Sequence, residues 1–301
     1  GKLAKIIKGV ARVVLILDLL VALTTIYFVI NLGRDVWQHR EMAKKEPADG
    51  RILPFTASLI FFLSTLGASD FALSSAIYTR LGWTTVRKLP GTVNAQCILP
   101  LAVMTVAYLS RVQVSWWLLV MCIIAQVIGA YIGPRLVMRL PDRMIRLSVG
   151  VGLLVSAALL LANQLHWVQT TGNATSLPVG KAILLAALLF VYGALNNIGI
   201  GSFAPTMVTV SFFGMSPLVA FPIMMGAAFF SIVVGSTVFI QAGAYSRKIV
   251  SYTSIFGIIG VLVAVFIVGQ LQMTVINWII LAILIYAAFI LLRPTADEIE
   301  A

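Results

Sequence analysis

The chain has 301 residues, of which 60% are hydrophobic and only 10% are charged, and its mean hydropathy is +1.04. This composition excludes a water-soluble globular protein, because too little polar surface is available to cover one, and it indicates a protein that uses lipid as its solvent. The net charge of +11 does not predict nucleic-acid binding, since the 21 Lys and Arg residues lie singly or in small groups between apolar runs, where membrane lipid head groups are the expected partners.

Apolar runs of about 18 residues or more recur along the chain, and each can cross a hydrocarbon core of about 30 Å as a helix. Because the runs lack the alternating polarity of barrel strands, we predict an all-α integral membrane protein. The first run, Val10 to Leu32, is too long for a signal-peptide core and has no small-residue cleavage site, so it is interpreted as a mature span. The polar stretch Arg34 to Arg51 follows, and we expect it at the membrane surface.

The rest of the chain is predicted to hold short helices, Gly-containing turns and long spans in a repeating order. In chain order these are the short helix Ile52–Leu66, the turn Gly67–Ser69, the short helix Asp70–Leu81, the spans Thr92–Leu109, Val114–Val137 and Met144–Leu161, the short helix Lys181–Leu195, the turn Asn196–Gly201, the short helix Ser202–Phe213, and the spans Pro217–Gln241, Ile249–Gly269 and Thr274–Leu292.

An internal repeat of about 132 residues relates the two halves of this order. We therefore predict four segments: 1–51 with the N-terminal transmembrane helix and the polar stretch, 52–163 as the first repeat, 178–293 as the second repeat, and 294–301 as a tail. The matching pairs are Phe71/Phe203, Ala72/Ala204, Ser74/Thr206, Gly82/Gly214 and Pro90/Pro222 at an offset of 132, with Gly129/Gly260 and Leu140/Leu271 at 131.

The distribution of basic residues tests two topologies, because Lys and Arg are retained preferentially in cytoplasmic loops. If each pair of short helices enters and leaves by one face, as a re-entrant hairpin, 15 of the 21 basic residues fall on the cytoplasmic side and 6 fall outside. If each pair instead forms one broken crossing, the split is 11 to 10. The sequence therefore predicts inverted repeats, each a re-entrant hairpin plus three crossings, although the four basic residues from Lys2 to Arg12 then lie outside.

The turns between the short helices are the candidate binding site. Irregular backbone at membrane depth must line a cavity or lie buried in protein, and each turn is followed by the positive N-terminus of a helix, which suits an anion. Gly lets the backbone approach a ligand closely, while Asn and Ser donate hydrogen bonds without net charge. The alternative is that these residues only form turns and cap helices. The predicted substrate-binding residues at the tips are Gly67, Ser69, Asp70, Asn196, Asn197, Gly199, Gly201 and Ser202.

Three further polar residues are predicted to contact the same ligand. Ser74 and Thr206 lie one helical turn beyond the tips, although hydroxyls in membrane helices often bond back to a carbonyl four residues earlier. Asn94 introduces an amide into the span that follows Pro90, as does Gln96, and both are interpreted as cavity-lining residues or as helix-to-helix hydrogen-bonding residues.

Asp70 and Asp18 are the acidic residues inside predicted spans, where a carboxylate is costly unless paired, protonated or functional. Asp70 lies at the first tip, where it would repel an anion unless it carried a proton or a cation. Our hypothesis is that Asp70 couples anion movement to H⁺ or Na⁺, with an ordinary helix-capping role as the alternative. We expect the Asp18 side chain either to pair with Arg12 or to extend toward the membrane–water interface.

The stretch GALNNIGIGSFAP over 193–205, followed by the turn at Gly214 and the helix Pro222–Gly235, resembles the TauE/SafE sulfite exporter-like family. That family carries, once per half, a turn of the type GxGGG, a short helix with Pro and a long span. The resemblance extends from Pro54 to Leu292, and the first half departs from the motif with Ala68-Ser69-Asp70 after Gly67 and with Leu73 in place of the Pro. It implies a membrane transporter for sulfite, a sulfonate such as sulfoacetate, thiosulfate or a related small anion.

The sequence therefore predicts a secondary transporter of a small anion in the bacterial inner membrane, working by alternating access. An anion channel and a membrane enzyme are the alternatives, and the enzyme is disfavoured because no nucleophile–base set, carboxylate pair or His/Asp metal set lies within the spans. No metal or cofactor is predicted, since Cys97 and Cys122 have no CxxC or Cys/His spacing and no P-loop is present.

Overall fold

The computed structural model describes residues 2–65, 69–109, 115–167, 172–198, 201–215, 217–267 and 273–293, and every regular element among them is a helix. Gly67 and Gly199, two predicted ligand contacts, lie outside these ranges. The helices are α1 (Lys2–Gln38), α2 (Arg40–Lys44), α3 (Leu53–Thr65), α4 (Asp70–Arg80), α5 (Leu89–Gln96), α6 (Ile98–Leu109), α7 (Trp116–Val137), α8 (Asp142–Gln164), α9 (Val179–Leu195), the 3-10 helix η1 (Asn196–Ile198), α10 (Phe203–Phe212), α11 (Pro217–Gln241), α12 (Arg247–Ile267) and α13 (Met273–Leu292).

Six helical segments among the described residues are long and apolar enough to cross a membrane. Shorter apolar helices are the first arms of the two predicted hairpins, α3 and α9, and the C-terminal part of α13. The all-α membrane fold predicted from the sequence is therefore confirmed. The six segments are Arg12–Gln38, Leu89–Val106, Trp116–Val137, Asp142–Gln164, Pro222–Gln241 and Arg247–Ile267.

Most predicted boundaries agree with these helices to within about two residues, but α1 and the span after Pro90 differ. α1 continues through Gln38 into the stretch that was expected to be polar surface. The predicted span Thr92–Leu109 is divided into α5 and α6 at Cys97. The break has a local cause, because Pro100 has no N–H to donate to the carbonyl of Gln96.

The two short helices α4 and α10 end in the same way. Gly82 and Gly214 both have positive φ, at 64° and 80°, a conformation that glycine adopts without strain. In each case the next residue donates its N–H to a carbonyl five residues earlier, from Trp83 to Tyr78 at 2.9 Å and from Met215 to Val210 at 3.2 Å. Both ends are thus Schellman motifs at matching positions of the repeat.

The two halves also exchange packing partners. α3 of the first half packs on α12 of the second, and α9 of the second packs on α7 of the first. A Cβ added at Gly129 on α7 would lie 1.9 Å from the Phe190 carbonyl oxygen, and one added at Gly260 on α12 would lie 2.0 Å from that of Ser58. Gly129 and Gly260 are a predicted repeat pair, so a close approach of two backbones occurs at matching positions of the two exchanged pairs.

Substitution of Gly260 by Ala is therefore expected to destabilise the protein by about 3 kcal/mol or more. The added methyl group would overlap a backbone carbonyl of α3, which cannot rotate aside as a flexible side chain could. Reversible unfolding in mixed micelles measures the change. Gly33→Ala is the matched control, since a Cβ there meets nothing within 4 Å and a helical Gly→Ala change is neutral or stabilising. Equal stability of the two variants would contradict the packing described for α3 and α12.

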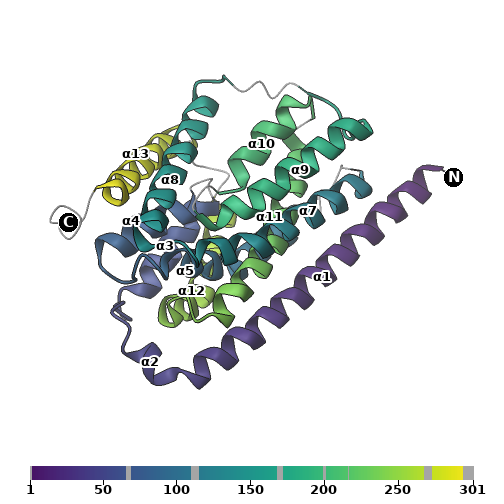
Figure 1. Ribbon diagram of the computed structural model, residues 1–301. Helices are drawn as coiled ribbons and strands as arrows, with labels where there is room; N and C mark the ends of the chain where they lie inside the picture. The colour runs from purple at the N-terminus through teal and green to yellow at the C-terminus, as the bar shows by residue number, and fades with distance from the viewer. Residues whose placement is uncertain are drawn as a thin grey trace.

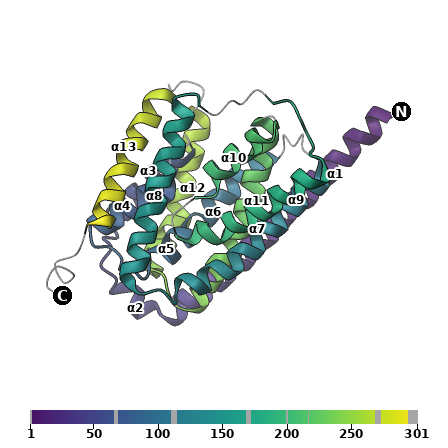
Figure 2. The ribbon, with the colours of Figure 1, turned by 45° about the horizontal axis from the view of Figure 1, so that its top comes forward.

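The helices form a bundle with α1 running obliquely along one side and α13 on the opposite side (Figure 1). α13 lies beside α8 (Figure 2). A Cβ at Gly150, in the first half of α8, would lie 2.8 Å from Leu292, the last residue of α13, so the two helices run antiparallel. The C-terminal end of α13 therefore lies beside the beginning of α8.

We call the end of the bundle that holds Glu46, Lys88 and Arg247 the anchor face. Glu46 lies 3.8 Å from Lys88 Nζ and accepts the Arg247 N–H at 3.2 Å, which brings together the chain before α3, after α4 and at the start of α12. At the other end, the far face, the Ala174 N–H donates to the Gly214 carbonyl at 3.2 Å. α11 connects the two faces with 25 residues, which is roughly 37 Å of helix.

Candidate functional site

The tip of the second helical pair is built around Asn196, the first residue of η1. Its Oδ1 accepts the backbone N–H of Ser202 at 3.1 Å, so its side chain closes the turn that leads into α10. Its Nδ2 donates to Asn94 Oδ1 on α5 at 3.1 Å. The structure thus brings together three predicted site residues, Asn94, Asn196 and Ser202, and all three are buried.

Asn94 is held in place by a second bond, since its Nδ2 donates to the Pro90 carbonyl at 2.8 Å. The Asn94–Asn196 contact joins the two halves of the chain across 102 residues. Helix-to-helix hydrogen bonding, one of the two interpretations of Asn94, is therefore confirmed. A role in contacting a ligand stays a prediction.

The start of α10 has no side-chain cap, and a buried hydroxyl one turn further has no partner among the described residues. Ser202 makes no side-chain capping bond, and Pro205 in the first turn has no N–H. One turn further, Thr206 Oγ1 is buried without a hydrogen-bond partner in the described part of the chain, and the residue is only 1% exposed. A buried hydroxyl without a partner is costly, so this cluster favours a ligand that accepts hydrogen bonds.

Asn197 bonds to the backbone at the end of α9, whereas Gly201 has open space around its Cα. Asn197 Nδ2 donates to the carbonyls of Gly193 at 3.1 Å and Ala194 at 3.3 Å, so its amide completes the end of α9. A Cβ at Gly235 would lie 3.0 Å from Asn197 Oδ1, which places Asn197 against α11. A Cβ at Gly201 would meet nothing within 4 Å. Asn197 therefore has a structural role in this conformation.

The tip of the first helical pair is organised differently. Ser69 caps α4 by accepting the Ala72 N–H at 3.3 Å, and Asp70 follows in the first turn, where a carboxylate favours the helix dipole. Asp70 is half-buried, and no ion pair to it is found within the described ranges. The N-terminus of α4 is thus occupied by the protein's own polar groups, whereas that of α10 lacks a side-chain cap.

A buried hydrogen-bonded chain extends from α4 to α5. The Tyr78 hydroxyl donates to Gln96 Oε1 at 2.5 Å, and Gln96 Nε2 donates to Ser74 Oγ at 2.5 Å. Ser74 and Tyr78 continue the helical face of Asp70 at four-residue intervals, so the three side chains line one stripe of α4. Ser74, a predicted ligand contact, is therefore already partnered, unlike its repeat partner Thr206.

Sequence reasoning did not single out Tyr78 or Ser236. The four-residue spacing of Asp70, Ser74 and Tyr78 is a signal that could have identified Tyr78. Ser236 is 0% exposed, has no partner for its hydroxyl in the described part, and follows Gly235, which lies against Asn197. An isolated serine in an apolar span gives no sequence signal that separates it from a packing residue.

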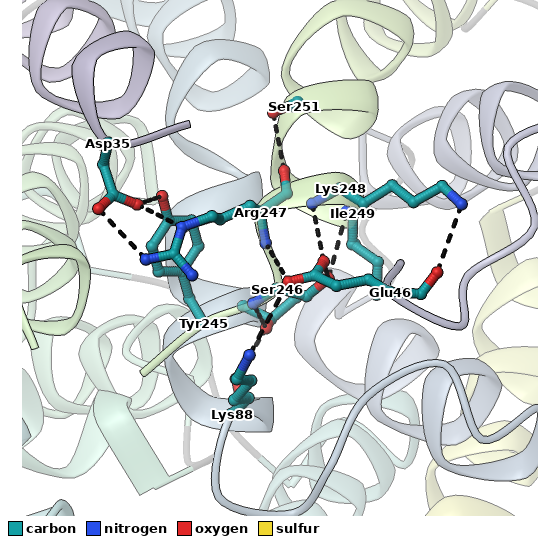
Figure 3. A network of polar contacts seen from close by, with 10 residues as sticks. Asp35, Glu46, Lys88, Tyr245, Ser246, Arg247, Lys248, Ile249 and Ser251 are labelled. Atoms are coloured by element: carbon teal, nitrogen blue, oxygen red, sulfur yellow. Dashed lines mark hydrogen bonds and ion pairs between the residues drawn. The ribbon is translucent and has the colours of Figure 1, made fainter. Parts of the chain in front are cut away.

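A second polar network lies on the anchor face and ties α1 to α12 (Figure 3). Arg247 Nε and Nη2 donate to the two oxygens of Asp35 at 2.7 and 3.2 Å, and the Tyr245 hydroxyl also donates to Asp35. Burial and the bond to Asp35 both raise the pKa of Tyr245, so its phenol stays protonated and remains a donor.

Glu46 caps α12 in the same network. Its carboxylate accepts the N–H groups of Arg247 and Lys248, at 3.2 and 2.9 Å, and the Ser246 hydroxyl at 2.5 Å. The negative charge and the helix N-terminus stabilise each other. This network anchors the segment after α2 and is separate from the cluster at Asn94.

The remaining expectations concern metal ligands and Asp18. No group of three or more His, Cys, Asp or Glu side chains that could hold a metal ion is found among the described residues, and Cys97 and Cys122 are free and buried. No hydrogen bond joins Asp18 to Arg12 in the part of α1 whose side chains are described, and Asp18 Oδ1 is buried without a partner there. The expected pairing of Asp18 with Arg12 is therefore absent from this conformation.

One comparison with known proteins gives a match. The family model described as sulfite exporter TauE/SafE matches residues 3–160, a segment that runs from α1 into α8. This range differs from the Pro54–Leu292 resemblance described above, since it includes α1 and ends before the second repeat. No curated protein and no solved structure matches the chain.

Proposed function

Because the chain belongs to the TauE/SafE sulfite exporter family, whose model matches residues 3–160, we propose that it carries a small anion across the membrane by alternating access. The membership makes it a transmembrane transporter rather than an enzyme. The proposed substrates are sulfite, thiosulfate, a sulfonate such as sulfoacetate, or a related organic anion. The proposed location is the bacterial inner membrane.

The observation that carries this proposal is the start of α10. The buried, unpartnered hydroxyl of Thr206 supplies a donor without negative charge, and the N-terminus of α10 has no side-chain cap. Such a set binds an oxyanion through the helix N-terminus and through charge-assisted hydrogen bonds. Asn94 and Asn196 position this helix start from across the repeat interface.

We propose that α3–α4 and α9–α10 are re-entrant hairpins. In support, the chain before α3 lies beside the chain after α4, at Glu46 and Lys88, and the chain before α9 bonds to the chain after α10, at Ala174 and Gly214. A hairpin whose outer ends lie together enters and leaves by one face. Backbone turns at the tips are tolerated at membrane depth where they are buried in protein, and Asn196 and Ser202 are buried.

We propose further that the repeats are inverted, with the anchor face in the cytoplasm. The antiparallel packing of α8 on its repeat partner α13 supports inversion, as does the placement of the two hairpin ends on opposite faces. Under this topology 15 of the 21 Lys and Arg residues lie on the cytoplasmic side.

The experiment that tests the function is a thermal-shift screen of the purified protein against sulfite, thiosulfate, sulfoacetate, lactate and malonate. A substrate stabilises the folded state by mass action, by about 2.7 kcal/mol at a hundredfold excess over Kd. We expect a shift with at least one sulfur oxyanion or sulfonate. Stabilisation only by neutral or cationic solutes would contradict the proposed substrate class. Saturable flux with counterflow would separate a carrier from an anion channel.

We propose that Asp70 couples anion transport to H⁺ or Na⁺. Asp70→Asn keeps the size of the side chain and one acceptor oxygen, replaces the other oxygen with a donor NH₂ group, and removes the charge. The variant is expected to bind the anion and to lose accumulation driven by a pH or Na⁺ gradient in proteoliposomes. An unchanged coupling ratio in Asp70→Asn would assign the carboxylate to helix capping alone.

A further inference from the structure

The short helix α5 lies between the two hairpins and contacts both α4 and η1. Its residues Asn94 and Gln96 are two positions apart, so their side chains project from opposite faces of the helix. Asn94 bonds to Asn196 in the second hairpin, and Gln96 bonds to Ser74 and Tyr78 in the first. Two amide side chains within one turn of α5 thus form hydrogen bonds with both helical pairs.

The bonds at Gln96 occupy both ends of its amide. Gln96, Ser74 and Tyr78 are each 0% exposed, so water cannot replace either bond if α4 moves relative to α5. Asp70 lies on the same face of α4, and Tyr78 and Cys97 are the titratable groups within electrostatic reach of it in the described part of the chain. A displacement of α4 at Asp70 is therefore transmitted to Gln96.

α5 lacks one backbone hydrogen bond at its junction with the helix that follows it. The chain leaves α5 at Cys97 and resumes as α6 at Ile98, since Pro100 leaves the Gln96 carbonyl without its helical donor. At its other end α5 begins at Leu89, directly after Lys88 on the anchor face. α5 is therefore a short helix whose start lies at the anchor face and whose end, near the two helical pairs, lacks one backbone hydrogen bond.

We propose that α5 couples the two hairpins, with Gln96 and Tyr78 as positioning residues that link the state of Asp70 to the anion site at α10. This inference depends on the proposed function. When Asp70 gains or loses a proton or cation, α4 shifts, Gln96 carries α5 with it, and the Asn94–Asn196 contact moves the start of α10. Gln96 then contributes to coupling and makes no contact with the anion.

The test uses the full-length protein in proteoliposomes with radiolabelled thiosulfate, which stays a dianion across neutral pH, so that pH dependence arises from the protein. Gln96→Leu is expected to retain thiosulfate binding in a thermal-shift assay and to retain downhill uptake, while losing accumulation driven by a pH or Na⁺ gradient. Tyr78→Phe removes one hydroxyl and is expected to reduce the accumulation partially. Gln126→Leu is the matched control, because Gln126 is a buried amide that bonds to Ser231 away from α5.

Accumulation by Gln96→Leu equal to that of the wild-type protein would overturn the inference, as would loss of thiosulfate binding, which would place Gln96 in the anion site. If Gln96→Leu does not fold, Tyr78→Phe decides: unchanged gradient-driven accumulation overturns the inference and reduced accumulation with intact binding supports it. If the wild-type protein does not bind thiosulfate, the same variants are measured with the anion that stabilises it in the thermal-shift screen; failure of the wild-type protein to bind or move any of those anions would overturn the proposed function, and the inference with it.

Discussion

Replacing Arg247 by Met is expected to destabilise the protein by about 3–5 kcal/mol, because it removes the arginine that pairs with the largely buried carboxylate of Asp35. The Arg247 side chain is only 6% exposed and donates two hydrogen bonds to Asp35, which also accepts from Tyr245. The loss therefore removes a charge-assisted pair that water cannot replace. The free energy of unfolding in mixed micelles measures the effect.

Two further variants show whether the loss of stability comes from the broken ion pair or only from the removal of a positive charge. Arg139→Met removes an exposed cation for which no ion pair is found in the described part of the chain, and it is expected to change stability little. Arg247→Met combined with Asp35→Leu removes both charges and is expected to recover most of the loss. A double variant no more stable than Arg247→Met alone would refute the ion pair as the source of the stabilisation.

Thr206→Val is expected to make the ligand-free protein more stable while weakening its affinity for the anion. The hydroxyl of Thr206 is buried without a partner, and leaving such a group unsatisfied costs about 1–3 kcal/mol. A hydrogen bond to a charged ligand contributes about 1.5–3 kcal/mol, so its loss weakens binding about 10- to 100-fold. Thermal unfolding and anion titration of the same sample measure the two effects.

The control is Thr209→Val, on the same helix and similarly buried. The Thr209 hydroxyl donates to the Pro205 carbonyl at 2.8 Å, so its removal is expected to lower stability and to leave anion affinity unchanged. If Thr206→Val instead lowered stability and left affinity unchanged, Thr206 would have a structural partner and no ligand.

The helices could be predicted from the sequence because they depend on local patterns. Continuous apolar runs determine the spans, and Gly82 and Gly214 end α4 and α10 at the same point of each repeat with the same backbone conformation. In the sequence, Gly129 and Gly260 are matched only by the alignment of the chain with itself. The structure gives it a physical reason, since each glycine allows a backbone carbonyl of another helix to approach.

The pairing of side chains across the fold could not be predicted, because it depends on which helices become neighbours. Nothing local indicates that Asn94 meets Asn196, or that Gln96 meets Ser74 rather than a ligand. The sequence predicts only one difference between the two tips, the negative charge of Asp70. The structure shows a second difference, because Ser69 caps α4 whereas α10 lacks a side-chain cap.

The anchor face illustrates a further limit of sequence patterns. The stretch after α1 was expected only to lie at the membrane surface, yet Glu46 caps α12 from 200 residues away through Ser246. Contacts of this kind depend on the topology of the whole chain.

Binding of an anion at the start of α10 can be observed in a structure of the protein determined with thiosulfate, whose sulfur atoms can be located by anomalous scattering. We expect sulfur density within hydrogen-bonding distance of Thr206 Oγ1 and of the Phe203 and Ala204 N–H groups. Density beside Asp70 instead, or thiosulfate bound only on the outer surface, would rule out this binding site.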